Sequence, residues 1–406
     1  MVITLNMIQT LAVAVVVLLC GQWLCKKIEI LSRFCIPSPV VGGFIFSLIA
    51  LFGHETEMFF FKMDVTLQSF FMMLFFTTIG FTASIKVLKK GGLQVFIFLT
   101  AAVVLVTLQN VVGVSLAKAF GLNPLLGLAT GSVPMTGGHG TSAAFAPLFE
   151  DLGAKGAVAV ALASATFGLI MGSMIGGPIA QMQIRKFNLL DKKTDNSEAE
   201  ALLNASDPDK PANPSNPTLH HNNILLGFYL ISIAMGLGSI VSMGFAKLGL
   251  TFPAYIGSMF IAAIMRNIGD SPNNNLHICM EEIGTLGDLF LSLFLAMALM
   301  SLKLWELADL AGPMVVMLLA QTALMASFAI FITFKVMGKD YDAAVMTAGH
   351  CGFGMGATPN AMANMKAVTN RFGPSVKAFF IIPIVGSLFI DFFNATVITM
   401  FMNFFK

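Results

Sequence analysis

Charged residues are scarce in this sequence, and long stretches contain none. Only 11% of the 406 residues are charged and 56% are hydrophobic, whereas a soluble domain carries about 25% charged residues. An ordinary soluble enzyme is therefore excluded. The 23 basic and 21 acidic residues nearly cancel, and no RNA- or DNA-binding motif occurs, so we expect no nucleic-acid partner.

Motifs that define several other classes of protein are also missing. The five cysteines form no C-x-x-C pair, so neither a disulfide framework nor a zinc site is expected. No phosphate-binding loop of the form G-x-x-x-x-G-K-[ST] occurs, which argues against an ATP-driven pump. The first bases, Lys26 and Lys27, follow the first apolar stretch instead of preceding it, so we interpret this stretch as a retained helix and not as a cleaved signal peptide.

Apolar segments of membrane-spanning length fill most of the chain. Because a helix of roughly 20 residues crosses a bilayer, we predict an all-α integral membrane protein. The segments form two series, separated by a polar stretch at 185–222 that is rich in Asp, Asn, Ser, Lys and Pro. This composition cannot bury a core and predicts a mobile aqueous linker. The predicted spans are 1–25, 34–54, 65–85, 91–117 and 156–184 in the first half, and 222–246, 248–265, 284–302, 310–334 and 375–405 in the second.

The two halves carry traces of an internal duplication. Leu and Phe positions recur in the third span of each half, and Gly and Thr positions recur in one glycine-rich segment of each half. We therefore divide the chain into an N-terminal repeat at 1–184, the linker at 185–222 and a C-terminal repeat at 223–406. The recurring positions are Leu67, Phe71, Leu74 and Phe75 with Leu286, Phe290, Leu293 and Phe294 at an offset of 219, and Gly121, Thr130, Gly137, Thr141 and Ala146 with Gly338, Thr347, Gly354, Thr358 and Ala363 at an offset of 217.

The distribution of Lys and Arg predicts the topology. The glycine-rich segments, at about 122–149 and 342–369, either cross the membrane or enter it and return. If neither crosses, ten spans place 17 Lys and Arg inside and 6 outside, whereas the split is 12 to 11 if both cross. Because basic residues accumulate on the cytoplasmic side, we predict ten transmembrane helices in two inverted five-helix repeats, each with a glycine-rich re-entrant hairpin. Both termini then lie outside and the linker lies in the cytoplasm.

The two glycine-rich segments form the predicted binding site. Glycines at bilayer depth leave backbone groups without helical partners, and such backbone survives only inside protein or beside a water-filled cavity. Thr358 before Pro359 has the form of a helix N-cap, and by the same argument a second half-helix starts near Thr141 and Ser142. Two helix N-termini that face one spot attract an anion. The candidate substrate-binding residues are Thr136, Gly137, Gly138, His139, Gly140, Thr141, Ser142, Gly354, Gly356, Thr358 and Asn360.

Asp391 is the most informative charged residue, because it lies near the centre of the last span. A carboxylate there costs roughly 2.5–3.5 kcal/mol on insertion scales, so such residues usually mark ion or substrate routes. Asn394 follows three residues later and can face the same cavity. With Asn110 of the fourth span, these residues are the candidate cation ligands. Pairing of Asp391 with a neighbouring helix is the structural alternative, and for Asp288 a functional and an interfacial role both stay open.

Other polar and small residues within the spans receive structural interpretations. Gln109 and Gln321, in the fourth span of each half, are expected to hydrogen-bond neighbouring helices. Gly168, Gly172 and Gly176 recur every four residues and predict a small face for close helix packing. Histidines beside the glycines have no second His or carboxylate at ligand spacing, so no resident metal site is expected.

Several stretches of the sequence resemble the bacterial sodium/glutamate symporters. The matching stretches are 165–169, 293–300, 303–307 and 349–364, and the similarity covers nearly the whole chain except the linker. The turn from Gly137 to Gly140 is similar to the loop motif of that family, while its counterpart in the second half is less regular.

This resemblance implies a carrier of the bacterial inner membrane that imports glutamate together with Na⁺. It also implies a homodimer, an elevator-type movement and no cofactor apart from the coupling ion, with membrane lipid as the surrounding partner. A Na⁺- or H⁺-coupled carrier of aspartate or of a citrate-like acid is the alternative, because the same groups suit other carboxylates. An intramembrane aspartyl protease is a remote alternative, since Thr285 stands where its GxGD motif requires glycine.

Overall fold

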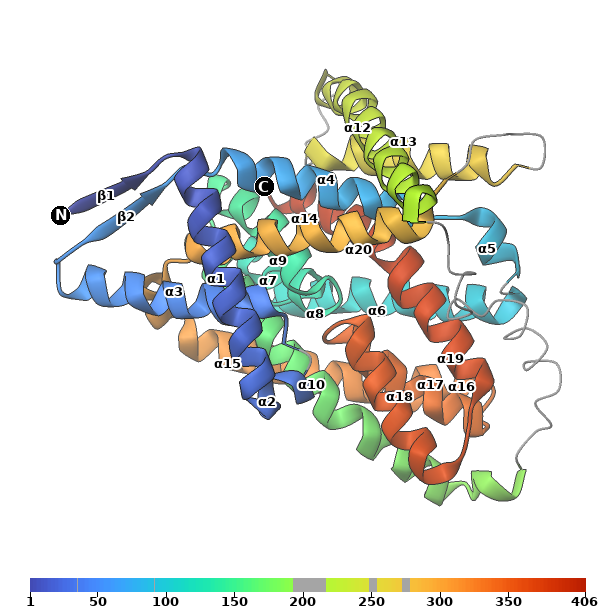
Figure 1. The fold of residues 1–406 in the computed structure, drawn as a ribbon. Coiled ribbons are helices and arrows are strands. Elements are labelled where there is room, and N and C mark those ends of the chain that lie inside the picture. The colour runs from blue at the N-terminus through green and yellow to red at the C-terminus, as the bar shows by residue number, and fades with distance from the viewer. Residues whose placement is uncertain (35, 91, 193–216, 248–253, 272–277) are drawn as a thin grey trace.

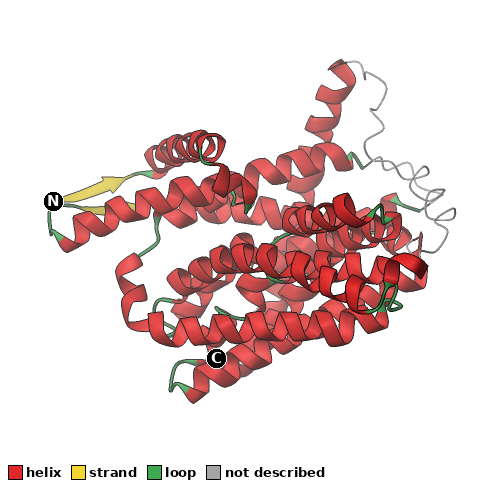
Figure 2. Cartoon of the chain, turned by 90° about the horizontal axis from the view of Figure 1, so that it is seen from below, coloured by secondary structure: helices red, strands yellow, loops and turns green. Residues whose placement is uncertain are grey.

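Helices make up almost the whole of the computed structural model, which describes residues 1–34, 36–90, 92–192, 217–247, 254–271 and 278–406 (Figure 2). Within these ranges the single sheet consists of two short parallel strands, β1 (Val2–Leu5) and β2 (Phe60–Met63). Most of the predicted linker, residues 193–216, lies outside the described residues.

The first half of the chain follows the predicted series of segments closely. Its first long helix begins after Asn6, whose side chain accepts from the Gln9 N–H at 2.9 Å while the Gln9 side chain accepts from the Asn6 N–H at 3.0 Å. This reciprocal cap satisfies two backbone donors that a helix start leaves free. The elements are α1 (Met7–Lys27), α2 (Glu29–Arg33), α3 (Ser38–Glu55), α4 (Thr66–Thr82), α5 (Ile85–Lys90), α6 (Gly92–Ala119), α7 (Pro124–Leu128), α8 (Ser132–Met135), α9 (Gly138–Asp151), α10 (Ala157–Lys186) and the 3₁₀ turn η1 (Leu189–Lys192).

The second half also consists of long helices, with several short helical segments between them. Its first helix begins at Pro217, inside the predicted linker of residues 185–222. The C-terminal end of the linker therefore lies earlier in the chain than predicted. The elements are α12 (Pro217–Lys247), α13 (Ala254–Gly269), α14 (Met280–Met300), η2 (Leu304–Leu310), α15 (Ala311–Phe328), η3 (Ala329–Thr333), α16 (Phe334–Val336), α17 (Tyr341–Gly354), α18 (Thr358–Phe372), α19 (Val376–Pro383), η4 (Ile384–Phe389) and α20 (Ile390–Phe405).

Within the described ranges, nine helices are long and apolar enough to cross a membrane. They correspond to nine of the ten predicted spans. The remaining predicted span, 248–265, lies partly outside the described residues, and its described part belongs to α13, which has 16 residues. Large apolar side chains are exposed on several of these helices, including Phe44 (47%), Phe96 (58%) and Phe331 (60%). Such surfaces are unfavourable in water and suit contact with lipid.

The helices pack into two groups, each of which contains elements from both halves of the chain. In what we call the panel group, α4 packs against α13 and α14, α3 packs against α1 and α14, and α12 packs against α13. In what we call the hairpin group, α6 packs against α7, α15 and α20, α10 packs against α9, α17 and α18, and α19 packs against α17 and η4. Figure 1 shows α12, α13 and α4 of the panel group at the top and α17 to α19 of the hairpin group at the lower right.

We call α7, α8 and α9 the first hairpin and α17 and α18 the second hairpin. Small residues on α10 allow the second hairpin to approach closely. A Cβ atom added at Gly168 would lie 2.2 Å from the carbonyl oxygen of Met355, and one at Gly176 would lie 2.3 Å from Nδ2 of Asn364. At Gly172 it would lie 2.9 Å from the carbonyl oxygen of Cys351. The interpretation of these three glycines as a packing face is therefore confirmed.

Two long helices of the second half contain π-helical segments. η3 lies between α15 and α16, and η4 joins α19 to α20 directly after Pro383. Proline has no N–H to donate, so a helix that contains it loses one backbone hydrogen bond and rearranges locally. Asp391 is the second residue after η4, so the direction of its side chain depends on this segment.

Candidate functional site

The turns of the two hairpins meet. Gly138, at the start of α9, has a φ of +63°, and a Cβ atom there would lie 3.3 Å from the carbonyl oxygen of Gly356. Gln109 of α6 connects the turns, because its Nε2 donates to the Gly354 carbonyl at 2.7 Å and its Oε1 accepts from the Thr136 hydroxyl at 2.8 Å. Gln321 of α15 in turn donates to the Gln109 carbonyl at 2.8 Å. Both glutamines therefore join helices, as predicted.

A cavity of about 550 Å³ opens beside these turns, between the panel group and the hairpin group. The panel group contributes residues of α1, of the start of α3, of α4 and of α14, while the hairpin group contributes the two turns, η4 and Asp391. A cavity of this size fits a small organic ligand. Eight of the predicted substrate-binding residues line it: Thr136, Gly137, Gly138, His139, Gly140, Thr141, Gly356 and Thr358.

The cavity contains two carboxyl groups and no described basic side chain of Lys or Arg. The carboxyl groups are those of Asp288 of α14 and Asp391 of α20. The carboxylate of Asp391 has no hydrogen bond or ion pair within the part of the chain that the structure describes. The structural alternative for Asp391, a fixed partner on a neighbouring helix, therefore receives no support.

The first turn supplies several hydrogen-bond donors to the cavity. The N–H groups of Gly138, His139 and Gly140 are at the start of the 14-residue helix α9, where a helix leaves its first N–H groups without internal partners. The Thr141 hydroxyl makes no hydrogen bond to another described residue. Together these groups offer several donors and the positive end of a helix to an anion.

His139 is held in one orientation by Thr166 of α10. Its Nε2 lies 2.9 Å from the Thr166 hydroxyl, which itself donates to the Leu162 carbonyl at 3.2 Å. Because the hydroxyl has a single proton, it accepts from His139, which places the ring proton on Nε2. The other ring nitrogen, Nδ1, is left as an acceptor.

Three predicted substrate-binding residues do not line the cavity. The Ser142 hydroxyl donates to the Gly138 carbonyl at 2.7 Å, and the Asn360 Nδ2 donates to the Leu169 carbonyl at 2.9 Å. Gly354 packs against Met325 and Leu105. All three contact residues on the side of the turns away from the cavity. The sequence could not distinguish them from their neighbours, because the direction of a side chain within a turn depends on tertiary packing.

The predicted helix starts require two corrections. α9 begins at Gly138 and not near Thr141 and Ser142, because glycine at positive φ already begins the helix three residues earlier. α18 does begin at Thr358, with Pro359 in its first turn, but its N-cap is Ala357 and no side chain caps it. The Thr358 hydroxyl instead donates to the Gly386 carbonyl at 2.9 Å and links α18 to η4.

The three predicted cation ligands lie at two separate positions. Asp391 lines the cavity, whereas Asn394 is 1% exposed and donates through Nδ2 to the Ser132 carbonyl at 3.2 Å. Asn110 is fully buried and accepts from the Ser132 N–H at 2.9 Å. The prediction that Asp391 and Asn394 face one cavity is therefore wrong, because the Asn394 side chain is buried against Ser132 and does not line the cavity. Asn110 and Asn394 do converge, on Ser132.

Sequence reasoning missed several residues of the cavity. Gln22 of α1, Ser38 of α3, Ser292 of α14 and Ser387 of η4 all line it. Polar residues in apolar helices were the available signal, but Ser is common in packed membrane helices and did not stand out. Asp288, left open by the sequence, is now placed in the cavity.

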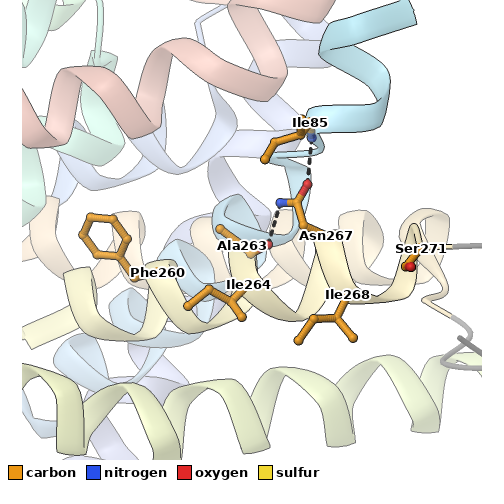
Figure 3. A pocket seen from close by; sticks show the side chains of 7 residues that line it. All are labelled: Ile85, Phe260, Ala263, Ile264, Asn267, Ile268 and Ser271. Atoms are coloured by element: carbon orange, nitrogen blue, oxygen red, sulfur yellow. Dashed lines mark hydrogen bonds between the residues drawn. The ribbon is translucent and has the colours of Figure 1, made fainter. Parts of the chain in front are cut away.

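Two other pockets lie away from the turns. The first, of about 650 Å³, lies between α13 and the start of α5 and is lined mainly by apolar side chains (Figure 3). Its one amide, Asn267, is already used: Oδ1 accepts from the Ile85 N–H at 2.8 Å, and Nδ2 donates to the Ala83 and Ala263 carbonyls at 2.8 Å each. This pocket offers no free polar group from that side chain, so it is a poorer candidate for a polar substrate than the cavity at the turns.

The second pocket, of about 370 Å³, again lies between the panel group and the hairpin group. Lys303 and Glu306 line it and form an ion pair at 3.3 Å. Glu150 accepts from the Val158 N–H at 3.0 Å, and burial raises the pKa of its carboxyl group. The two groups of helices thus have a polar pocket at each of two places along their contact.

Long apolar helices around a polar cavity, with two non-helical turns meeting inside, define a multi-pass membrane transport protein. The family model for the sodium/glutamate symporter matches residues 3–374, and the chain belongs to this family. A sodium/glutamate symporter of Haemophilus influenzae is 43% identical over 400 residues, which cover 97% of this chain and 96% of that protein. One of Escherichia coli (strain K12) is 41% identical over 399 residues, which cover 98% of each chain.

Membership of this family decides between a transporter and an intramembrane protease, the two classes of protein that the sequence left open. The predicted resemblance is confirmed, and the family consists of transporters and not of enzymes. The intramembrane protease alternative is therefore wrong.

Proposed function

We propose that this protein imports L-glutamate across the bacterial inner membrane by Na⁺ symport, and that the cavity at the hairpin turns is its substrate site. One observation carries the proposal beyond family membership. The cavity combines N–H and hydroxyl donors with two carboxylates and no described basic side chain. An anionic substrate in such a place repels Asp288 and Asp391 unless cations accompany it.

The membrane potential leads to the same requirement. Glutamate has a net charge of −1, and its import against an inside-negative potential costs about 2.3 kcal/mol per 100 mV. One Na⁺ cancels this cost, and a second makes import favourable. Coupling to Na⁺ therefore supplies both the local charge and the driving force.

The contacts support a division of labour among the lining residues. The N–H groups of Gly138, His139 and Gly140 and the Thr141 hydroxyl bind a substrate carboxylate. Asp391, which has no partner among the described residues, binds the substrate ammonium group. Thr136, Gly137, Gly356 and Thr358 shape the cavity, while Ser142, Gly354 and Asn360 hold the turns in place.

The arrangement of the two helix groups supports alternating access by an elevator-type movement. The cavity is lined by Gln22 and Ser38, close in sequence to the bases Lys26 and Lys27, which the topology assigns to the cytoplasm. The pocket at Lys303 and Glu306 belongs to the predicted outer side. Movement of the hairpin group along the panel group exchanges which of these places leads to the turns.

The proposal includes ten spans, two inverted repeats, re-entrant hairpins and a homodimer. A cysteine introduced within residues 193–216 is expected to react only with cytoplasmic reagents, and one at Lys155 only with reagents added outside. Reaction of the linker cysteine from the periplasm contradicts this topology.

Uptake of labelled glutamate into proteoliposomes tests the function directly. An imposed Na⁺ gradient should drive accumulation, and K⁺ and pH gradients of equal size should not. Competition by unlabelled aspartate and citrate defines the substrate class. Accumulation that follows the pH gradient and ignores Na⁺ contradicts the proposal.

A further inference from the structure

Three buried side chains, that of Ser132 and those of two asparagines bonded to its backbone, each leave one polar atom without a hydrogen-bond partner among the described residues. The atoms are Nδ2 of Asn110, Oγ of Ser132 and Oδ1 of Asn394. The side chains are joined through the Ser132 backbone, since its N–H donates to Asn110 Oδ1 at 2.9 Å and its carbonyl accepts from Asn394 Nδ2 at 3.2 Å. Unpaired buried polar atoms are costly, and three of them on side chains joined through one residue point to a bound water or ion.

The chain is not helical at this place. α7 ends at Leu128 and α8 begins at Ser132, so residues 129–131 interrupt the first leg of the hairpin. Pro134 has no N–H, so the carbonyl of Thr130, four residues earlier, lacks the donor that a continuous helix supplies. This carbonyl, two residues before Ser132, accepts no hydrogen bond from another described residue and is available as a ligand oxygen.

The orientation of the Asn394 amide is fixed by its partner. Because its Nδ2 already donates to the Ser132 carbonyl, the unpaired atom is the oxygen and not the nitrogen. The same reasoning applies to Asn110, whose Oδ1 is used by the Ser132 N–H, so that Nδ2 is the free atom. The cluster thus contains oxygens that suit a hard cation and one donor that suits a water molecule in the cation's shell.

We propose that this cluster binds Na⁺, with the Ser132 hydroxyl, the Asn394 amide oxygen and the Thr130 carbonyl as protein ligands. Asn110 positions Ser132 and holds a water of the ion's shell. Non-helical carbonyls together with neutral oxygens are suitable ligands for Na⁺ in a transporter. This inference rests on the proposed function, and it separates the ion from Asp391, which is left for the substrate ammonium.

The site is connected to the substrate cavity through the backbone. The Ser132 carbonyl also accepts from the N–H groups of Thr136 at 3.2 Å and Gly137 at 3.0 Å, and both of these residues line the cavity. An ion that fixes Ser132 therefore fixes the start of the first turn. Na⁺ binding prepares the donors that receive glutamate, which is a physical route to coupling.

Thermal unfolding of the purified full-length protein tests the site with Na⁺ alone. NaCl is compared with choline chloride at equal ionic strength and without glutamate, for the wild type, Ser132→Ala, Asn394→Ala and Ser164→Ala. Ser164 is the matched control, because it is also fully buried with an unpaired hydroxyl but lies on α10. We expect Na⁺ to stabilise the wild type and Ser164→Ala, and the Na⁺ concentration for half-maximal stabilisation to rise at least about tenfold in the two cluster variants.

The Na⁺ dependence of uptake in proteoliposomes gives the second measurement. Ser132→Ala is expected to need at least about tenfold more Na⁺ for half-maximal uptake, with Ser164→Ala unchanged. If the wild type shows Na⁺-driven uptake and both cluster variants keep its Na⁺ curves, the cluster holds only water and the inference is overturned while the proposed function stands. If the wild type shows no Na⁺-driven uptake, the proposed function itself fails.

Discussion

The two hairpins share an outline but differ in their interiors. The first leg of the first hairpin is interrupted at residues 129–131, and its turn presents His139 and Thr141 to the cavity. The corresponding leg of the second hairpin, α17, is an unbroken helix with every residue buried. Of α17 itself Phe353 reaches the cavity, and the turn that follows it and the start of α18 contribute Gly356 to Pro359.

The histidines show the same contrast. His139 lines the cavity, whereas His350 is fully buried among Phe98, Phe328 and Phe353, with Nδ1 2.8 Å from the Thr333 hydroxyl. The two glycine-rich hairpins therefore have different surroundings. The first hairpin carries most of the polar groups, and the second forms a packed wall against which α10 rests.

One glycine substitution in each hairpin should give the largest difference between the two. In Gly138→Val a β-branched residue is forced to a φ of +63° and fills the space between the turns, so we expect uptake to fall by about 100-fold with normal insertion. In Gly354→Val the new side chain meets the flexible ends of Met325 and Leu105, which should lower stability by about 1–3 kcal/mol. Uptake per folded molecule and melting temperature are measured on the same preparations.

Equal loss of uptake in both glycine variants, at unchanged melting temperature, contradicts the proposed difference between the turns. The sequence alone predicts equal behaviour, because both glycines belong to aligned glycine-rich segments. A difference between the two glycine variants would therefore support the structure, because the sequence motif alone does not predict one.

Neutralising the two cavity carboxylates should give the next largest effect. Asp391→Asn removes a half-buried charge without a described partner, and we expect glutamate affinity to fall by about 30-fold or more with normal folded yield. Asp288 is exposed, so Asp288→Asn should change affinity by no more than about fivefold. Binding of labelled glutamate at saturating Na⁺ decides the order, and a wild-type affinity in Asp391→Asn removes this residue from the site.

Substitution of the two histidines should affect different properties: glutamate uptake at His139 and stability at His350. His139→Gln is expected to raise the KM for glutamate by several fold, about 1 kcal/mol, with an unchanged melting temperature. His350→Gln should leave KM unchanged in the folded fraction and lower stability by about 1–3 kcal/mol, because it leaves Thr333 without its partner inside an aromatic cluster. A normal KM in His139→Gln, or a KM defect confined to His350→Gln, reverses the assignment.

The smallest effect is expected at Thr358. Its hydroxyl links α18 to η4 and does not cap the helix, so Thr358→Ala should cost about 1 kcal/mol of stability and change uptake by less than about threefold. Thr141→Ala, which removes a free hydroxyl from the first turn, is the companion variant and should weaken glutamate binding more. Equal uptake by the two variants shows that the hydroxyls are equivalent.

The long elements of this fold could be predicted because the bilayer imposes a simple rule on the sequence. Apolar runs at 65–85 and 91–117 correspond to α4 and α6, and the glycine-rich segments coincide with the hairpins. Charge-free length fixes the position of a span within a few residues. The family resemblance added the function, which composition alone does not reveal.

The facing of individual side chains could not be predicted in the same way. Asn394 lies three residues after Asp391, and helical spacing alone places both on one side of a regular α-helix. The structure instead turns Asn394 toward Ser132, 262 residues away in the chain. Such contacts depend on which helix packs against which face, and no local pattern records that choice.

The π-helical segment η4, which precedes Asp391, has a consequence for changes in chain length. A π turn holds more residues than the α turn it replaces. Removal of one residue from Ile384–Phe389 therefore lets the segment become α-helical while all later side chains keep their directions. The same deletion just after Asp391 rotates the following side chains by about 100°. Variants of this protein that have lost one residue should therefore be tolerated within η4 and rejected a single turn later.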